Sequence, residues 1–210
     1  AHALEAPPLT GRLVDRAGVL DPAQKSVLEG EIRGLEQTTG GQMAVLLVDT
    51  LDGDSVEDFS MRVAEKWKIG HKGADNGLLF VAAIKDRRMR LEVGYGWEGV
   101  INDARVGDII RGVSGFFRAK DYFGGVQYSI RKSRELITGS PADVRPPPKK
   151  KKSQEIPWWL LTPIVILVIL SNFFRRRGVT YWGGGSSGGG GGGFSGGGGS
   201  FGGGGASGDW

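Results

Sequence analysis

The sequence predicts an α/β domain, with a small mixed β-sheet sandwiched by about four helices, followed by one transmembrane helix. Two continuous apolar runs, 43–48 and 78–84, have the length of strands that are covered on both faces. Segments with apolar residues at helical spacing precede, separate and follow these runs. A third observation is the run 156–174, which carries no charge and is broken only by prolines. A domain on a membrane anchor is therefore expected.

The domain begins with a short lead, a possible strand at 12–14 and a helix with clear end signals. Asp21 is a good N-cap, Pro22 suits the first helical position and Gln24 completes a capping box. The glycines at 40–41 end the helix, because glycine accepts the left-handed conformation of a C-cap. The first buried strand follows directly.

The next predicted elements are a helix, a long loop and a hairpin. The second helix begins near Asp54 and Glu57, and its apolar residues extend to Trp67. The loop 69–77 is dense in glycine and turn-forming residues and leads into the second buried strand. Residues 88–93 alternate charged and apolar side chains, which predicts a strand with one solvated face, antiparallel to its predecessor.

A glycine-rich turn at 94–99 precedes two further helices, with apolar positions at 106–117 and 123–137. The turn lacks the glycine spacing of a dinucleotide site, and no parallel strand–helix unit begins there. We expect Tyr95 and Trp97 to be exposed on this turn. Exposed aromatic residues of this kind suit a protein contact.

Composition divides the chain into a lead (1–12), the α/β domain (13–140), a linker rich in proline and lysine (141–155), the membrane helix (156–174) and a basic, then glycine-rich tail (175–210). At about 1.5 Å per residue, the run 156–174 matches the roughly 30 Å hydrocarbon core of a bilayer. Tryptophans at 158–159 fall where an aromatic belt would lie, and arginines at 175–177 stop the run.

Charge and cysteine content exclude several functions. The net charge of +4 comes from residues after 140, so the domain itself is near neutral and no nucleic-acid partner is expected. The basic clusters 149–152 and 175–177 are better placed to meet lipid headgroups. Because the chain has no cysteine, disulfides, thiol nucleophiles and cysteine-ligated metals are ruled out.

The start of the chain suggests a location. Ala1-His2-Ala3 has the small-x-small form that a signal peptidase leaves. A removed signal followed by one span predicts a single-pass inner-membrane protein, with an extracytoplasmic, periplasmic domain and a cytoplasmic tail. The arginines at 175–177 obey the positive-inside rule in this orientation, whereas the lysines at 149–152 do not.

Several short motifs occur in a fixed order: Val19-Leu20-Asp21, Thr39-Gly40-Gly41-Gln42, Trp67-Lys68-Ile69-Gly70, Asp75-Asn76-Gly77, Gly94-Tyr95-Gly96, Glu98-Gly99 and Asp103. With them, residues 13–138 resemble the TPM domain family. The whole chain is similar to its bacterial membrane-anchored members, whose glycine-rich tails end in Gly-Ala-Ser-Gly-x-Trp, as residues 205–210 do here. The resemblance implies a compact α/β domain, calcium binding in some members, acid phosphatase activity in a plant member and roles in the upkeep of membrane complexes.

The candidate metal ligands are oxygen-bearing side chains in glycine-flanked loops: Asp15, Asp75, Asn76 and Asp103. Calcium takes six to eight oxygen ligands at about 2.3–2.6 Å, and flexible loops can supply them. Each of these residues could instead cap a helix or a turn. If they converge at one end of the sheet, they predict a calcium site, and calcium is the one candidate cofactor.

The catalytic signals are weak. The sequence contains no P-loop and no His-Glu-x-x-His motif, and His71 is the one histidine inside the domain. We expect a protein that is not an enzyme. The alternative is a metal-dependent acid phosphatase that would use a bound metal with Asp75 or Asp103.

The tail favours an interaction role. Aromatic residues stand among its glycines at Phe194, Phe201 and Trp210. Such a tail should not fold alone, because glycine loses much entropy on ordering and buries little surface. We therefore predict that other subunits of a membrane complex bind the tail, and that the chain is an accessory or assembly subunit of that complex.

Overall fold

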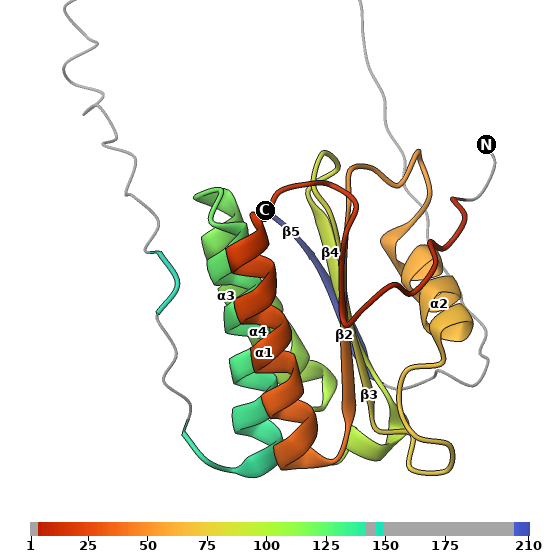
Figure 1. Ribbon diagram of the computed structural model, residues 1–210, viewed down its shortest axis with the longest axis vertical. Coiled ribbons are helices and arrows are strands. Elements are labelled where there is room, and N and C mark those ends of the chain that lie inside the picture. Colours follow the sequence, from red (N-terminus) through yellow and green to blue (C-terminus); the bar gives the residue numbers. More distant parts are fainter. Residues whose placement is uncertain (1–3, 142–145, 149–203) are drawn as a thin grey trace, which may run out of the picture. The chain divides into compact units, whose positions relative to one another are not determined.

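The computed structural model describes residues 4–141, 146–148 and 204–210 (Figure 1). Along the chain the elements are β1 (Leu13–Asp15), α1 (Pro22–Thr39), β2 (Gln42–Val48), α2 (Val56–Trp67), β3 (Gly77–Ala83), β4 (Arg88–Val93), the short 3-10 helix η1 (Tyr95–Trp97), α3 (Asp103–Arg118), α4 (Tyr122–Thr138) and β5 (Gly205–Asp209).

The strands form one mixed sheet in the order β1-β2-β3-β4-β5. β1, β2 and β3 are parallel, whereas β4 runs antiparallel to both β3 and β5. The predicted α/β class, the two buried strands and the antiparallel partner of the second are thus confirmed. The fifth strand was not predicted, because it comes from the glycine-rich tail.

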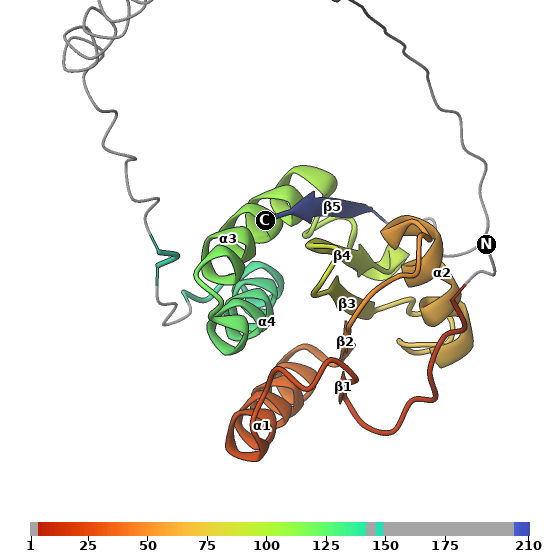
Figure 2. The same ribbon diagram turned by 90° about the horizontal axis from the view of Figure 1, so that it is seen from above.

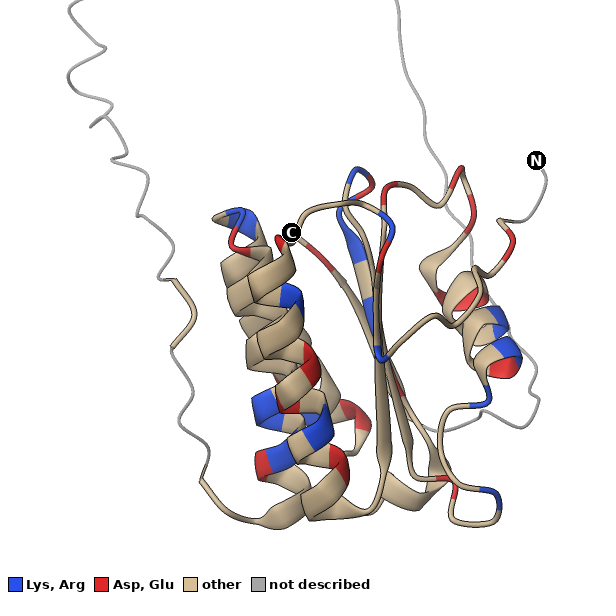
Figure 3. Ribbon diagram, in the orientation of Figure 1, with Lys and Arg blue, Asp and Glu red and all other residues tan. Residues whose placement is uncertain are grey.

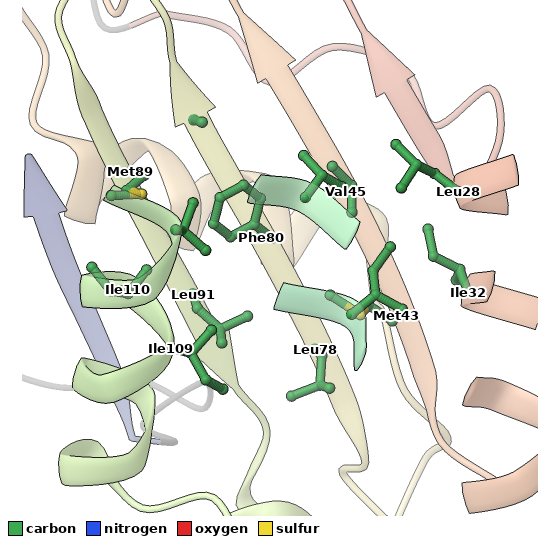
Figure 4. Close-up of a cluster of buried hydrophobic side chains, with 14 of the residues drawn as sticks. Leu28, Ile32, Met43, Val45, Leu78, Phe80, Met89, Leu91, Ile109 and Ile110 are labelled. Atoms are coloured by element: carbon green, nitrogen blue, oxygen red, sulfur yellow. The ribbon is translucent and has the colours of Figure 1, made fainter. Parts of the chain in front are cut away.

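Helices cover both faces of the sheet (Figure 2). On one face, α1, α3 and α4 pack over alternate strand residues; Figure 4 shows this cluster, which includes Leu28, Ile32, Met43, Val45, Leu78, Phe80, Met89, Leu91, Ile109 and Ile110. On the other face α2 contributes Phe59 and Val63, which pack with Leu46, Leu79 and Val81. Both faces of β2 and β3 are covered, which agrees with the continuous apolar residues of β2 after Gln42 and of β3 after Gly77.

Local signals set both ends of α1 as the sequence predicts. The Asp21 carboxylate accepts the Gln24 N–H at 2.8 Å, and the Gln24 side chain accepts the Asp21 N–H at 3.0 Å. Gly40 ends α1 with a left-handed φ of 71°. Gly139 ends α4 in the same way, with a φ of 67°.

The prediction of one solvated face for residues 88–93 is wrong at its second half. Arg88 is exposed, but Glu92 is fully buried, because α2 covers this end of β4. The Ser60 hydroxyl of α2 donates a hydrogen bond of 2.6 Å to Glu92, and the Arg90 guanidinium binds both carboxylate oxygens. A buried ion pair thus replaces the expected solvent contact.

Several sequence predictions fall outside the described residues. The run 156–174, Phe194 and Phe201 are among them. No helix within the described ranges is long and apolar enough to cross a membrane.

Candidate functional site

Three loops meet at the end of the sheet where β2 and β3 begin and β4 ends. We call residues 40–42, 69–77 and 94–99 the loop end. Main-chain hydrogen bonds join them: the Gln42 N–H donates to the Asn76 carbonyl at 3.0 Å, and the Gly96 N–H donates to the Asp75 carbonyl at 3.0 Å. The Gln42 side chain accepts the Gly70 N–H at 2.9 Å. The motifs that were separate in the sequence therefore form one interlocked surface.

Glycine is required at the loop end because the backbones touch. A Cβ atom on Gly77 would lie within 3.0 Å of the Ile69 carbonyl, and one on Gly96 would lie within 3.0 Å of the Ala74 carbonyl. Backbone atoms cannot rotate away as a flexible side chain can. The turn-forming glycines of the sequence thus permit close packing of three loops.

We expect Gly96→Ala to lower the free energy of unfolding by about 1–3 kcal/mol, the usual cost of forcing extra atoms into a packed site. The matched control is Gly99→Ala, since a Cβ on Gly99 meets nothing within 4 Å. Urea unfolding of both variants measures the difference. Equal midpoints for the two variants would contradict this account of the loop end.

The structure does not bring the four predicted metal ligands together. Asp15 ends β1 and is in register with Leu47 and hence Ala82, whereas Asp75 and Asn76 precede Gly77. At roughly 3.3 Å per residue along parallel strands, about 17 Å separates the two levels. Among the described residues, no group of three or more His, Asp or Glu side chains could hold a metal ion.

The Asp15 carboxylate is already bound within its own turn. It accepts the N–H groups of Gly18 at 2.8 Å and Leu20 at 3.1 Å, and Lys25 lies 3.1 Å away. The Asp15 side chain has no exposed surface. It fixes the turn between β1 and α1, so calcium binding as first predicted does not fit these residues as one site.

Asp15→Ala is therefore expected to lower the free energy of unfolding by about 1.5–3 kcal/mol, the range for hydrogen bonds to a charged group. The loss should be the same in EDTA and in millimolar calcium, because the partners of this carboxylate are protein groups. Thermal unfolding under both conditions tests this. A loss that appears only with calcium would restore a metal role for Asp15.

Asp75 and Asn76 belong to the loop end, and Asn76 has a structural role there. Its side-chain oxygen accepts the His71 N–H at 2.9 Å, and its amide nitrogen donates to the Gly40 carbonyl at 2.9 Å. Asp103 is the first residue of α3, whose N-cap is the neighbouring Asn102. His71 itself is exposed.

The predicted contact residues have different surroundings. Tyr95 is 48% exposed, as expected. Trp97 is half-buried, and its ring lies so close to Gly41 that a Cβ there would come within 3.0 Å of it. Trp210 packs on Phe117 of the same chain, with ring centroids 4.8 Å apart and planes at 82°. Tyr95 therefore remains the aromatic residue that the loop end offers to a partner.

A hollow of about 370 Å³ lies beside the loop end, between the N-terminal lead and the start of β2. Its lining includes Trp67, Ile69 and Met43, and also Arg12 and Glu36. These two charged residues bind each other at 2.6 Å. The lining therefore carries opposite charges that are paired with each other.

The edge of β4 holds the end of the tail. Five residue pairs, from Arg88 with Asp209 to Glu92 with Gly205, join β4 and β5 in antiparallel register. The Val93 N–H extends this ladder with a 3.1 Å hydrogen bond to the Gly204 carbonyl. This strand is hard to predict from the sequence, because glycine is depleted in strands. A usable signal was the change from repeated glycine to a mixed ending, 205–210, with a terminal tryptophan.

Family comparison agrees with the fold and the motifs. The family model of the TPM domain matches residues 13–135, more than half of the chain. The chain belongs to the TPM domain family. The matched region runs from β1 into α4, so β5 comes from outside the matched part of the TPM domain. A comparison with curated proteins finds no match.

Solved structures show the same TPM fold. The N-terminal domain of a protein from P. gingivalis is 26% identical, with a TM-score of 0.60, and the match covers 72% of this chain and 100% of that one. The BA42 protein of the psychrophilic bacterium Bizionia argentinensis is 22% identical, with a TM-score of 0.52 and coverage of 66% and 91%. The N-terminal domain of a Corynebacterium glutamicum protein is 13% identical, with a TM-score of 0.51 and coverage of 74% and 98%. The last two likenesses concern the fold alone.

Proposed function

We propose that this chain is a membrane-anchored TPM-domain protein that acts as an accessory or assembly subunit of a membrane protein complex, with its domain outside the cytoplasm. The observation that carries the proposal is the loop end, where three interlocked loops present the exposed Tyr95. A surface that is already ordered loses little entropy on binding, and tyrosine is enriched at protein interfaces.

The charge distribution favours a protein partner. Lysine and arginine residues are interspersed with aspartate and glutamate over the helices and loops of the domain (Figure 3). A nucleic-acid-binding domain would concentrate positive charge on one face. The P. gingivalis and C. glutamicum relatives are described as N-terminal domains, which fits the use of this fold as a module of a longer protein. Here the module precedes the apolar run 156–174.

The phosphatase alternative receives no such support. A metal-dependent phosphatase needs carboxylates gathered around its ion, and among the described residues no group of three or more His, Asp or Glu side chains, around Asp75, Asp103 or elsewhere, could hold one.

The test is co-purification of the full-length chain from membranes in mild detergent. Tyr95→Ala is expected to lower the recovery of specific partner subunits at least tenfold, because central aromatic residues of an interface commonly account for about 2 kcal/mol or more. The matched control is Val27→Ala, since Val27 is also 48% exposed but lies on α1. Quantitative mass spectrometry measures partner ratios. Equal recovery with Tyr95→Ala and wild type would refute a contact through the loop end.

A further inference from the structure

We propose that the TPM domain and the C-terminus of this chain lie on the same side of the membrane, held together by β5. The apolar run 156–174 then enters and leaves the lipid through one face, and does not cross it. This inference rests on the membrane anchoring in the proposed function. It replaces the expectation that the tail is cytoplasmic while the domain is exported.

The first support is that β5 pairs with β4 and packs closely against α3. Small residues are needed on both of its faces. A Cβ on Gly208 would come within 3.0 Å of Ile110 on α3, and a Cβ on Gly205 would come within 3.0 Å of Arg90 and Glu92. The ending of the tail therefore matches the space that this domain leaves for it.

The second support is that polar and aromatic contacts hold both ends of β5. The Gly204 N–H donates to the Glu98 carboxylate at 3.0 Å, where the strand begins. Where it ends, the Ser114 hydroxyl donates to the Asp209 carbonyl at 3.0 Å, and Trp210 packs edge-on against Phe117. In the middle, Arg90 donates to the Ser207 hydroxyl at 3.0 Å. A strand held at this many points is part of the domain.

The third support is where the chain leaves and re-enters the domain. α3 begins beside Gly204: a Cβ on Gly204 would come within 3.0 Å of the side chain of Asp103, the first residue of α3. α4 then runs antiparallel to α3 (Figure 1). Figure 1 shows that α4 ends and β5 begins at the same end of the sheet. The chain that contains the apolar run therefore leaves from and returns to one end of the domain.

A single crossing is incompatible with this pairing. It would place β4 and β5 on opposite sides of roughly 30 Å of hydrocarbon, and backbone hydrogen bonds cannot reach across it. Exchange of β5 between copies does not help, since copies of one orientation would all have their tails opposite their domains. We call entry and exit of the run through the same face of the lipid one-sided insertion; it leaves β4 and β5 on one side and so permits their pairing.

The sequence around the run fits one-sided insertion. Lysines at 149–152 precede it and arginines at 175–177 follow it. A single crossing puts one of these clusters on the side that basic residues avoid, whereas one-sided insertion lets both meet the headgroups of one leaflet. Pro163 lies inside the run and removes a helical hydrogen bond there, which favours a bend.

The test uses the absence of native cysteine. Arg88 and Asp209 are both exposed and directly paired. Directly opposed residues of antiparallel strands have Cα atoms about 4.5–5.5 Å apart, within the range that a disulfide bridges. In membranes that contain the full-length Arg88→Cys/Asp209→Cys variant, mild oxidation should link most of the chain internally. The control pair Lys72→Cys/Asp209→Cys should not link. Lys72 belongs to the loop end, where β4 ends and β5 begins, whereas Asp209 pairs with Arg88 at the opposite end of β4.

A second measurement gives the sidedness directly. An impermeant maleimide should label the single variants Arg88→Cys and Asp209→Cys from the same side of sealed vesicles. Labelling from opposite sides would overturn the inference. Carbonate extraction reports separately on anchoring: release of the chain refutes the proposed function and this inference together, whereas opposite labelling of an anchored chain refutes the inference alone.

Discussion

Replacing Arg90 with alanine is expected to lower the free energy of unfolding by about 3–5 kcal/mol, the cost of leaving a buried charge without its partner. Glu92 is 0% exposed, and its two carboxylate oxygens are bound by Arg90, with Ser60 as the further donor. Once the guanidinium is gone, one neutral hydroxyl remains to compensate a full charge. Urea unfolding of the full-length chain measures the loss.

The control for Arg90 is the double variant Arg90→Met/Glu92→Leu. It removes both charges and keeps the volume, and apolar replacement of a buried pair is often neutral or stabilising. Ser60 keeps a partner, because its hydroxyl also donates to the Glu57 carbonyl at 3.0 Å. A single variant as stable as the double variant would show that the ion pair contributes little.

Glu92 also shows where sequence reasoning about the fold stops. The alternation in 88–93 identified the strand and its direction, because both depend on local pattern. It could not reveal that α2 would cover the charged face, because that depends on which strands α2 packs against in the folded domain. β2 and β3 raised no such difficulty, because continuous apolar residues indicate cover on both faces.

The candidate site was predictable in part. The glycine motifs indicated loops, and the structure joins them at one end of the sheet. The metal prediction was conditional on Asp15 and Asp75 converging at one end of the sheet, and it grouped them by ligand chemistry alone. The order of elements already argued against one shared site. Asp15 comes at the end of a strand and Asp75 before the start of another, and in parallel strands these positions lie at opposite ends of the sheet. β5 was missed for another reason. Its fit depends on the close approach of Gly208 to Ile110 of α3, and no local sequence pattern predicts a contact between such distant residues.

Gly208→Val is expected to release β5 and to expose alternate amides of β4. The new side chain would overlap Ile110, and overpacking of this kind costs about 3 kcal/mol at the upper end of its usual range. That energy corresponds to exchange about a hundredfold faster. The affected amides are those that point to β5: Val93 donates to Gly204, and in an antiparallel ladder Met89 and Leu91 follow the same alternation.

The alternation separates release of β5 from general unfolding. In hydrogen exchange of the Gly208→Val chain, Arg90 and Glu92 should keep their protection, because the odd and even amides of β4 face different neighbours. Ser207→Thr is the matched control, since Ser207 is exposed and threonine retains the hydroxyl that Arg90 binds. Faster exchange at all of β4 would mean that β5 stabilises the whole domain. Unchanged exchange at Val93 would contradict the expected release of β5.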